Sequence, residues 1–327
     1  MRTLAVGYGV LTVICCGWVG GSLSWAQTYP ARPVRLVLQT AAASAPDVLM
    51  RPIAKRFSES VGQQMIVDNR PGAAGVVAAQ VVMNASADGY TVLLAASGAM
   101  SIAPFVAKKR PYDPFQDFSP VTLIAVAPLI VTAHPSLPVK SGKELIELAK
   151  ARPKQILYAS PGAATVQHLT IEMFSRAASI SMVHVPYKSG APAVIDTVSG
   201  QVQLVITAVP AVLQQIKAER LRALAVTGAK RSVAVPDVPT IAESGVQGFE
   251  SLTWYGIYAP KNTLAEIVQK LYGELRKATD DPGVKSTAMR EGVDLEVNGA
   301  LADFHRVDAA KWQKVIHELR APTVALE

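Results

Sequence analysis

Cysteine is almost absent from this sequence. The two cysteines, Cys15 and Cys16, lie within the first 26 residues, and the segment from residue 27 to residue 327 contains none. A segment without cysteine cannot form disulfides or use a thiolate as a nucleophile. Thiol chemistry is therefore excluded for this segment, and its stability must come from buried surface.

Sequence motifs of the common enzyme classes are also missing. The chain has no G-x-S-x-G elbow, no H-E-x-x-H pair, no Walker loop and no dinucleotide-binding glycine pattern. Its histidines are scattered, and none has a neighbour at metal-ligand spacing: His134, His168, His184, His305 and His317. We predict a protein that is not an enzyme, with no catalytic residue, no metal site and no cofactor.

Blocks of like charge and long apolar runs are lacking as well. The 32 Lys and Arg exceed the 25 Asp and Glu, so the net charge is +7, and this excess either attracts anionic partners or only maintains solubility. Without a basic block, we expect no nucleic-acid partner. After residue 26 the longest apolar segment, 121–133, is shorter than the roughly 18 residues of a membrane helix. We therefore expect no membrane span in this part of the chain.

The first 26 residues differ from the rest. Arg2 precedes an apolar stretch at 4–19, and residues 24–26 (SWA) place small side chains where a signal peptidase cleaves. Glycines dilute the stretch below what a membrane anchor needs, and the two cysteines are not preceded by the small residue of a lipidation site. We expect 1–26 to be a signal peptide cleaved after Ala26, which places the mature chain outside the cytoplasm.

Short β-branched runs alternate with helical patterns in the segment that follows. Strands are predicted at 34–38, 65–67 and 90–94, with a helix at 75–85 between the last two. The first helix shows an apolar face made by Leu49, Ile53, Phe57 and Val61. Asp47 is expected at its N-cap rather than as a general base, and Pro52 is expected to bend or loosen its first turns. The βαβαβ order predicts parallel strands with right-handed crossovers.

The segment 121–133 is predicted to cross into a second α/β repeat of similar size. There Ser141 and Glu144 form a capping box for a helix that ends near Lys150. Strands are expected at 156–159, 182–185, 202–206 and 224–226, with helices that begin near residues 165 and 191. A strand at 253–258 carries the chain back, and helices at 265–279, 283–291 and 303–319 should pack onto the first domain. We therefore assign 27–125 and 253–327 to lobe 1 and 126–252 to lobe 2.

Two lobes joined by two crossings bring their strand-to-helix loops to one cleft, where open α/β sheets bind ligands. Three loops are candidates: 39–47 and 97–99 in lobe 1, and 160–165 in lobe 2. Helix N-termini offer free N–H groups and partial positive charge, so such loops can hold a carboxylate without a buried arginine. Taken singly, each loop is equally typical of a tight turn in any α/β domain.

Eight segments of the mature chain resemble the substrate-binding receptors of tripartite tricarboxylate transporters, also called Bug receptors. They are 29–37 (YPARPVRLV), 68–73 (DNRPGA), 87–93 (ADGYTVL), 112–118 (YDPFQDF), 183–188 (VHVPYK), 200–203 (GQVQ), 221–227 (LRALAVT) and 236–240 (PDVPT). The resemblance implies a type 2 periplasmic-binding-protein fold, a Venus flytrap of two doubly wound α/β lobes joined by a two-stranded hinge. It also implies a periplasmic receptor, expected as a monomer, that closes on small carboxylated solutes and delivers them to membrane subunits. A receptor read by a sensor kinase ectodomain is the alternative.

The resemblance also implies where the ligand binds, and this chain departs from the family pattern there. Relatives usually have glycines at the positions of Ala41, Ala42 and Ala43, before the acidic residue matched by Asp47, and hold one carboxylate with the amides of this loop, helped by the loop at 160–165 and by ordered water. Ala163, Ala164, Val166 and Thr207 also replace residues that are commonly more polar. We therefore expect a less polar ligand, or loss of the usual ligand class. The predicted ligand-binding residues are Thr40, Ala42, Ala43, Ser44, Asp47, Ser97, Gly98, Ser160, Gly162, Ala163, Thr165 and Thr207.

Overall fold

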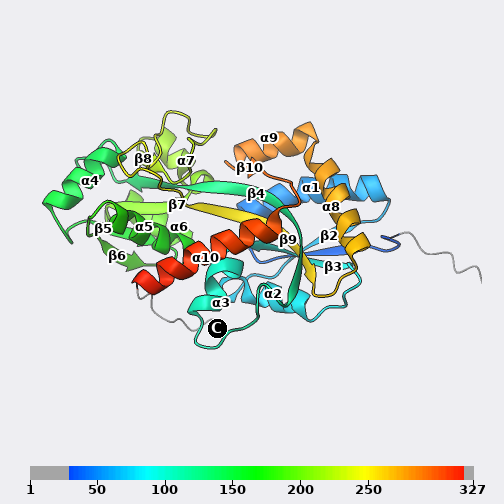
Figure 1. Ribbon diagram of the computed structural model, residues 1–327. Helices are drawn as coiled ribbons and strands as arrows, with labels where there is room; N and C mark the ends of the chain where they lie inside the picture. Colours follow the sequence, from blue (N-terminus) through cyan, green and yellow to red (C-terminus); the bar gives the residue numbers. More distant parts are fainter. Residues whose placement is uncertain (1–28, 320–327) are drawn as a thin grey trace, which may run out of the picture.

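The computed structural model describes residues 29–319, so the expected signal peptide lies outside the described residues. Two α/β lobes lie side by side and are joined by two long strands (Figure 1). Within 29–319, no helix combines the length and the apolar character that a membrane crossing requires.

Three parallel strands form the centre of lobe 1. They are β1 (Val34–Leu38), β2 (Met65–Asn69) and β3 (Thr91–Ala96), in the order β2-β1-β3, with α1 (Ala45–Val61), η1 (Ala73–Gly75) and α2 (Val76–Met83) between them. Both strand pairs are parallel, which confirms the predicted βαβαβ unit. Leu36 and Leu38 pack in one core with α1, whereas Val37 packs in another with α2. Alternate side chains of one strand therefore enter cores on both faces of the sheet.

Lobe 2 repeats this arrangement. Its parallel strands are β5 (Leu157–Ser160), β6 (Val183–Pro186) and β7 (Leu204–Ala208), accompanied by α4 (Gly142–Ala151), α5 (Val166–Ala177) and α6 (Gly190–Val198). The capping box is confirmed, because the Ser141 hydroxyl accepts a hydrogen bond from the Glu144 N–H at 3.2 Å. The sequence analysis did not predict α7 (Val209–Lys217), which lies between β7 and β8 (Arg222–Val226).

Two long strands connect the lobes. β4 (Phe118–Ala133) pairs with β9 (Leu252–Pro260) along Phe118 to Pro128, and with β7 and β8 from Leu129 to Ala133. The partners of β4 therefore change from lobe 1 to lobe 2 within a single 16-residue strand. This is the two-stranded hinge that was predicted, while the lobe boundaries at 125/126 and 252/253 stay a prediction.

The C-terminal helices do not all belong to lobe 1. α8 (Ala265–Thr279) and α9 (Pro282–Arg290) pack against α1, and the short β10 (Asp294–Leu295) pairs with β4. α10 (Leu301–Leu319) starts in a lobe 1 core at Leu301 but ends in a lobe 2 core, where Trp312 and Val315 pack with residues of α5. The expectation for 303–319 is thus right only for the start of the helix, because 19 residues span about 28 Å and reach across both lobes (Figure 1).

The start of α1 also differs from expectation. Ser44, not Asp47, occupies the N-cap position, and Asp47 is the third helical residue. Pro46 fits the first turn because no backbone N–H is needed there, and this shifts the helix start upstream of Asp47. Pro52 leaves the helix continuous from Ala45 to Val61.

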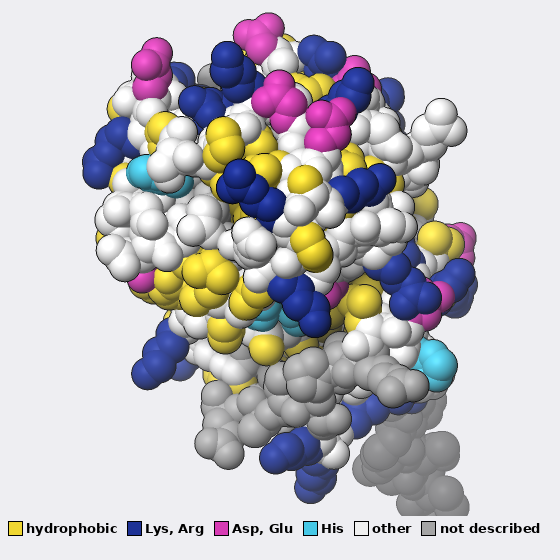
Figure 2. All heavy atoms as spheres, turned by 90° about the vertical axis from the view of Figure 1, so that its left-hand side faces the viewer, with side chains coloured by type: hydrophobic (Ala, Val, Ile, Leu, Met, Phe, Trp, Pro, Cys, Tyr) yellow, Lys and Arg dark blue, Asp and Glu magenta, His cyan; other side chains and the backbone are white. Residues whose placement is uncertain are grey.

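The basic side chains are spread over the surface. Viewed from the lobe 2 end, Lys and Arg are dispersed among acidic and hydrophobic side chains rather than gathered in one block (Figure 2). Most of the described ion pairs join residues that are close in the sequence, as in Arg306 with Asp303. The basic side chains behind the net charge of +7 are therefore dispersed where they lie on this face, and they mark no single docking area there.

Candidate functional site: a cleft between the lobes

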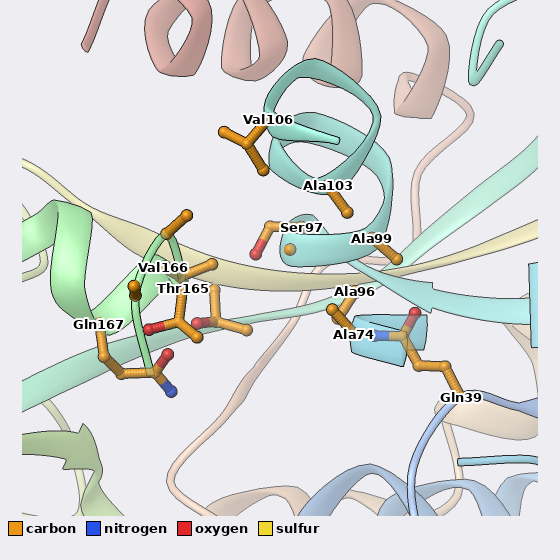
Figure 3. Close-up of a pocket in the computed structure, with 14 residues that line it drawn as sticks. Gln39, Ala74, Ala96, Ser97, Ala99, Ala103, Val106, Thr165, Val166 and Gln167 are labelled. Carbon is orange, nitrogen blue, oxygen red and sulfur yellow. The ribbon is translucent and has the colours of Figure 1, made fainter. Parts of the chain in front are cut away.

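A cavity of about 210 Å³ lies between the lobes (Figure 3). Its lobe 1 wall includes the ends of β1 and β3, which were predicted as strands. It also includes a π-type turn η2 (Gly98–Ile102) and the short helix α3 (Ala103–Val106), which were not predicted beyond the loop at 97–99. Its lobe 2 wall is the loop before α5, and the hinge strand β9 contributes Thr253. The lining residues are Gln39, Ala74, Ala96, Ser97, Gly98, Ala99, Ala103, Val106, Ala163, Ala164, Thr165, Val166, Gln167 and Thr253.

The two lobes approach each other closely here. A Cβ placed on Gly98 would lie 3.7 Å from the Val166 side chain on the opposite wall. Nine of the fourteen lining residues are Ala, Gly or Val, and none is charged. The cavity can therefore hold a ligand by apolar contact and neutral hydrogen bonds from both lobes, but it offers no group for general acid–base chemistry.

Two polar groups in the lobe 1 wall are buried without a hydrogen-bond partner. The Ser97 side chain is fully buried and its hydroxyl has no partner among the described residues, and the same is true of the Gln39 Oε1 atom. A Cβ on Gly75 would come within 2.6 Å of that oxygen, so only glycine leaves room for the Gln39 amide. A buried polar group left unpaired costs about 1–3 kcal/mol. Such groups next to a cavity mark the place where a bound molecule supplies hydrogen bonds.

The loop at 160–165 is held together by its own side chains. The Thr165 hydroxyl caps α5 by accepting a hydrogen bond from the His168 N–H at 3.3 Å, and it donates to the Gly162 carbonyl at 2.8 Å. Gly162 has φ 143°, which side-chain-bearing residues rarely adopt. The buried Ser160 hydroxyl is hydrogen-bonded to His184 at 2.7 Å. These hydroxyls therefore shape the loop, and the N-terminus of α5 faces the cavity.

A stack of aromatic rings within lobe 2 holds this loop in place. The rings of His168 and His184 lie 4.0 Å apart, and Tyr158 stacks on the other side of His184 at 4.9 Å. His168 Nδ1 accepts a hydrogen bond from the Ala164 N–H at 3.1 Å. The pKa of both histidines is lowered to about 4, by burial at His168 and by burial together with the neighbouring His168 at His184. Both rings are therefore neutral at pH 7 and serve as acceptors or donors within lobe 2.

The loop at 39–47 is organised by a buried carboxylate. Asp47 accepts hydrogen bonds from the Ala43 N–H at 2.9 Å, from Arg51 and from Asn69. Burial alone would raise the pKa of Asp47, but these hydrogen bonds outweigh it and keep the pKa below its usual value. Ala43 adopts φ 62° although it carries a side chain. The Ser44 N–H donates to the Ala41 carbonyl at 3.3 Å, so both amides already have partners inside the loop.

The structure brings only part of the predicted site together. Ser97, Gly98, Ala163 and Thr165 line the cavity. The others surround it without lining it, and their role in binding stays a prediction: Thr40, Ala42, Ala43, Ser44, Asp47, Ser160, Gly162 and Thr207. Thr207 is buried in β7. His168 stacks on His184 and does not line the cavity.

Several lining residues were missed by the sequence analysis. Gln39 directly follows the predicted strand 34–38, as Ser97 follows β3, so its position at a strand end could have identified it. Gln167 lies in the first turn of α5, whose start was predicted. Ala103, Val106 and Thr253 carry no local pattern that indicates a cavity, because only the packing of the lobes brings them together.

Comparison with known proteins agrees with this architecture. Residues 49–320 match the family model described as tripartite tricarboxylate transporter family receptor. A UPF0065 protein of Pseudomonas sp. strain P51 is 36% identical over 296 residues, covering 89% of this chain and 88% of that protein. Protein BugT of Bordetella pertussis is 32% identical over 303 residues, covering 90% of this chain and 92% of BugT.

Two solved structures are similar over nearly the whole chain. A Rhodopseudomonas palustris protein with adipate has 34% identity and a TM-score of 0.81, covering 90% of this chain and 99% of that one. MatC of the same organism, with bound malate, has 26% identity and a TM-score of 0.76, covering 88% of this chain and all of MatC. The overall fold is thus shared with these proteins, and the chain belongs to the family of tripartite tricarboxylate transporter receptors, which are periplasmic solute-binding receptors of the Bug type rather than enzymes.

Proposed function

We propose that this receptor captures a small carboxylated solute by closing its two lobes around it and delivers the solute to the membrane subunits of a tripartite transporter. The observation that carries the proposal is the cavity, which is lined by lobe 1, lobe 2 and hinge residue Thr253. A ligand shifts the balance of open and closed states only by binding one of them better. Contacts from both lobes provide that difference. The adipate and malate complexes of the two similar structures support a carboxylate as the ligand.

The carboxylate is proposed to lie between Ser97 and the N-terminus of α5. α5 has 12 residues, and the first N–H groups of a helix lack intrahelical partners. These groups and the positive end of the helix dipole favour a bound anion. Ser97 adds a buried hydroxyl that has no other partner in the described structure. The loop at 39–47 then acts by supporting this wall, through the hydrogen bonds of Asp47.

Calorimetric titration with a panel of acids, combined with small-angle scattering, tests capture by closure. Acetate, hexanoate, phenylacetate, adipate and malate cover one and two carboxylates with short and long bodies. We expect at least one acid to bind and to reduce the radius of gyration. An unchanged radius at saturation, or chemical turnover of the acid, would contradict the proposal.

Ser97→Ala locates the bound carboxylate. The variant should lower affinity by about 0.5–1.5 kcal/mol without any loss of stability, because the hydroxyl has no protein partner to lose and its removal ends the cost of burying it unpaired. Ser101→Ala is the matched control, since Ser101 is equally buried and unpartnered in η2 but does not line the cavity. Equal affinity losses in the two variants would place the carboxylate elsewhere.

Delivery and export need separate experiments. A pull-down from a membrane extract with the ligand-bound receptor should recover the membrane subunits of a transporter, and recovery of a sensor kinase alone would overturn the transport role.

The proposed signal peptide predicts that the periplasmic protein begins at Gln27. N-terminal sequencing of protein released from the periplasm checks this.

A further inference from the structure

The cavity presents an apolar wall opposite its polar groups. Ala99, Ala103 and Val106 of lobe 1 form this wall. Figure 3 shows Val106 and Ala103 above the cavity and the amides of Gln39 and Gln167 below it. A ligand that fills the cavity therefore contacts the two amides on one side and, apart from the Ser97 hydroxyl, only apolar side chains on the other.

Among residues 29–319, no cationic side chain lines this cavity. None of the lining residues is charged. Arg51, the arginine bound to Asp47, is already paired with that carboxylate and lies outside the lining. Lys188 follows Tyr187, whose N–H donates to the Ser160 carbonyl, but its side chain is exposed and does not line the cavity either.

A bound carboxylate must exchange its hydration for hydrogen bonds from the protein. The free N–H groups of α5, the Ser97 hydroxyl and the neutral amides can satisfy one carboxylate. A second one would meet the apolar wall and lose its hydration without compensation, which is unfavourable for an ion. An apolar body, in contrast, gains from burial against the same wall.

We propose that this cleft selects solutes with a single carboxylate and an apolar body over dicarboxylates of the same length. The inference rests on the proposed function and specifies its substrate class. The single carboxylate binds at the α5 and Ser97 end, and the hydrocarbon body contacts Ala103 and Val106.

The test compares acids that differ only in the second carboxylate. Titration calorimetry at pH 7.5 with hexanoate against adipate, and phenylacetate against 1,4-phenylenediacetate, should show the monoacid bound at least tenfold more tightly in at least one pair. Equal or tighter binding of both diacids overturns the inference while leaving capture of carboxylates intact. Failure of every acid to bind refutes the proposed function itself.

A charge-adding variant tests the physical cause. Gln167 is half-buried at the cavity, so Gln167→Lys supplies a cation with little disturbance of the core. It should raise the affinity for the diacid relative to the monoacid by at least tenfold. Gln214→Lys is the control, because Gln214 is exposed on α7 of the same lobe and adds the same charge away from the cavity. If the two variants change the ratio equally, or neither changes it, the missing cation is not the cause and the inference fails.

Discussion

The two loops that approach the cleft, 39–47 in lobe 1 and 160–165 in lobe 2, are held in place by different chemistry. In lobe 1 a buried carboxylate, Asp47, collects hydrogen bonds from the loop backbone, Arg51 and Asn69. In lobe 2 neutral groups hold the loop in place. His168 accepts a hydrogen bond from the Ala164 N–H, and His184 is hydrogen-bonded to the Ser160 hydroxyl. Of the loop at 39–47 only Gln39 lines the cavity, and Asp47 does not, whereas Ala163, Ala164 and Thr165 of the neutral loop do.

This difference shows how a site proposed to bind an anion can be built without a charged side chain in its lining. A buried carboxylate at the cavity would repel an anionic ligand, whereas neutral imidazoles do not. Asp47 does not line the cavity and is paired with Arg51, so its charge stabilises the loop outside the cavity lining. The following variants test whether the loops depend on these groups in the way described.

The largest effect is expected for Asp47→Ala. The change removes a carboxylate whose side chain is 2% exposed and leaves the Ala43 N–H, Asn69 and Arg51 without their acceptor. We expect a loss of about 2–4 kcal/mol in the free energy of unfolding, measured by urea denaturation, and weaker ligand binding. Asp303→Ala, which removes an exposed partner of Arg306, should cost less than about 0.5 kcal/mol. Similar losses in both variants would contradict the role given to Asp47.

The second-largest effect is expected on acidification, which should weaken the hold of His168 and His184 on the loop at 160–165. The folded-state pKa of His168 and His184, about 4, lies below the usual 6.5, so their contribution is complete above pH 6.5 and is lost as the pH falls toward 4. Between pH 7 and pH 5 we expect the pair to lose about 2 kcal/mol, a value already halved for partial exposure.

Urea denaturation at the two pH values measures this loss. Buried His305, whose pKa is also lowered by burial, titrates in the same direction. The relevant quantity is therefore the difference between the wild type and the double variant His168→Phe, His184→Phe. A double variant with the pH dependence of the wild type would show that other groups cause it.

Thr165→Ala should have a moderate effect of about 1 kcal/mol on stability, because it removes the N-cap of α5. Ser141→Ala removes the equivalent cap of α4, remote from the cavity lining, and should cost about the same. Only Thr165→Ala should also weaken ligand binding in calorimetry. Equal affinities for the two variants would mean that the start of α5 is not part of the site.

The smallest effects concern alanines with positive φ, one in each loop: Ala43 at 62° and Ala164 at 56°. Ala43→Gly relieves this strain at an exposed position and should raise stability by about 0.5 kcal/mol. Ala164→Gly gives the same relief but removes a buried methyl, so its net effect should be about zero. Thermal denaturation compares them, and a larger gain for Ala164→Gly would contradict its packing role. Ala43→Gly is also expected to shift ligand preference toward more polar acids.

Local patterns predicted most of the fold. The strand at 34–38, the capping box at Ser141 and the parallel order of the lobe 1 strands depend on neighbouring residues and on short connections, and all were found. The helix α7 also has a local signal that was not used, because Val209, Val212 and Ile216 recur at helical spacing.

The site was less predictable because its walls come from distant parts of the chain. Strand ends indicated Ser97 and Gly98, and a helix start indicated Thr165, since these are local features. The same reasoning placed Ala43 and Ser44 at the ligand, but the structure shows their amides engaged within the loop. Whether an amide is free depends on the tertiary position of Asp47, which the sequence does not show.

The sequence by itself determined the alternation of strands and helices, the two lobes with their hinge, and the receptor family, because periodicity, capping and collinear motifs are local. Only the tertiary structure decided which side chains face the cavity, that α10 spans both lobes, and that charge is kept out of the lining. The physical reason is that the cavity is lined by residues from distant parts of the chain, such as Gln39, Val106 and Val166. How close these residues come to one another depends on how the two lobes pack.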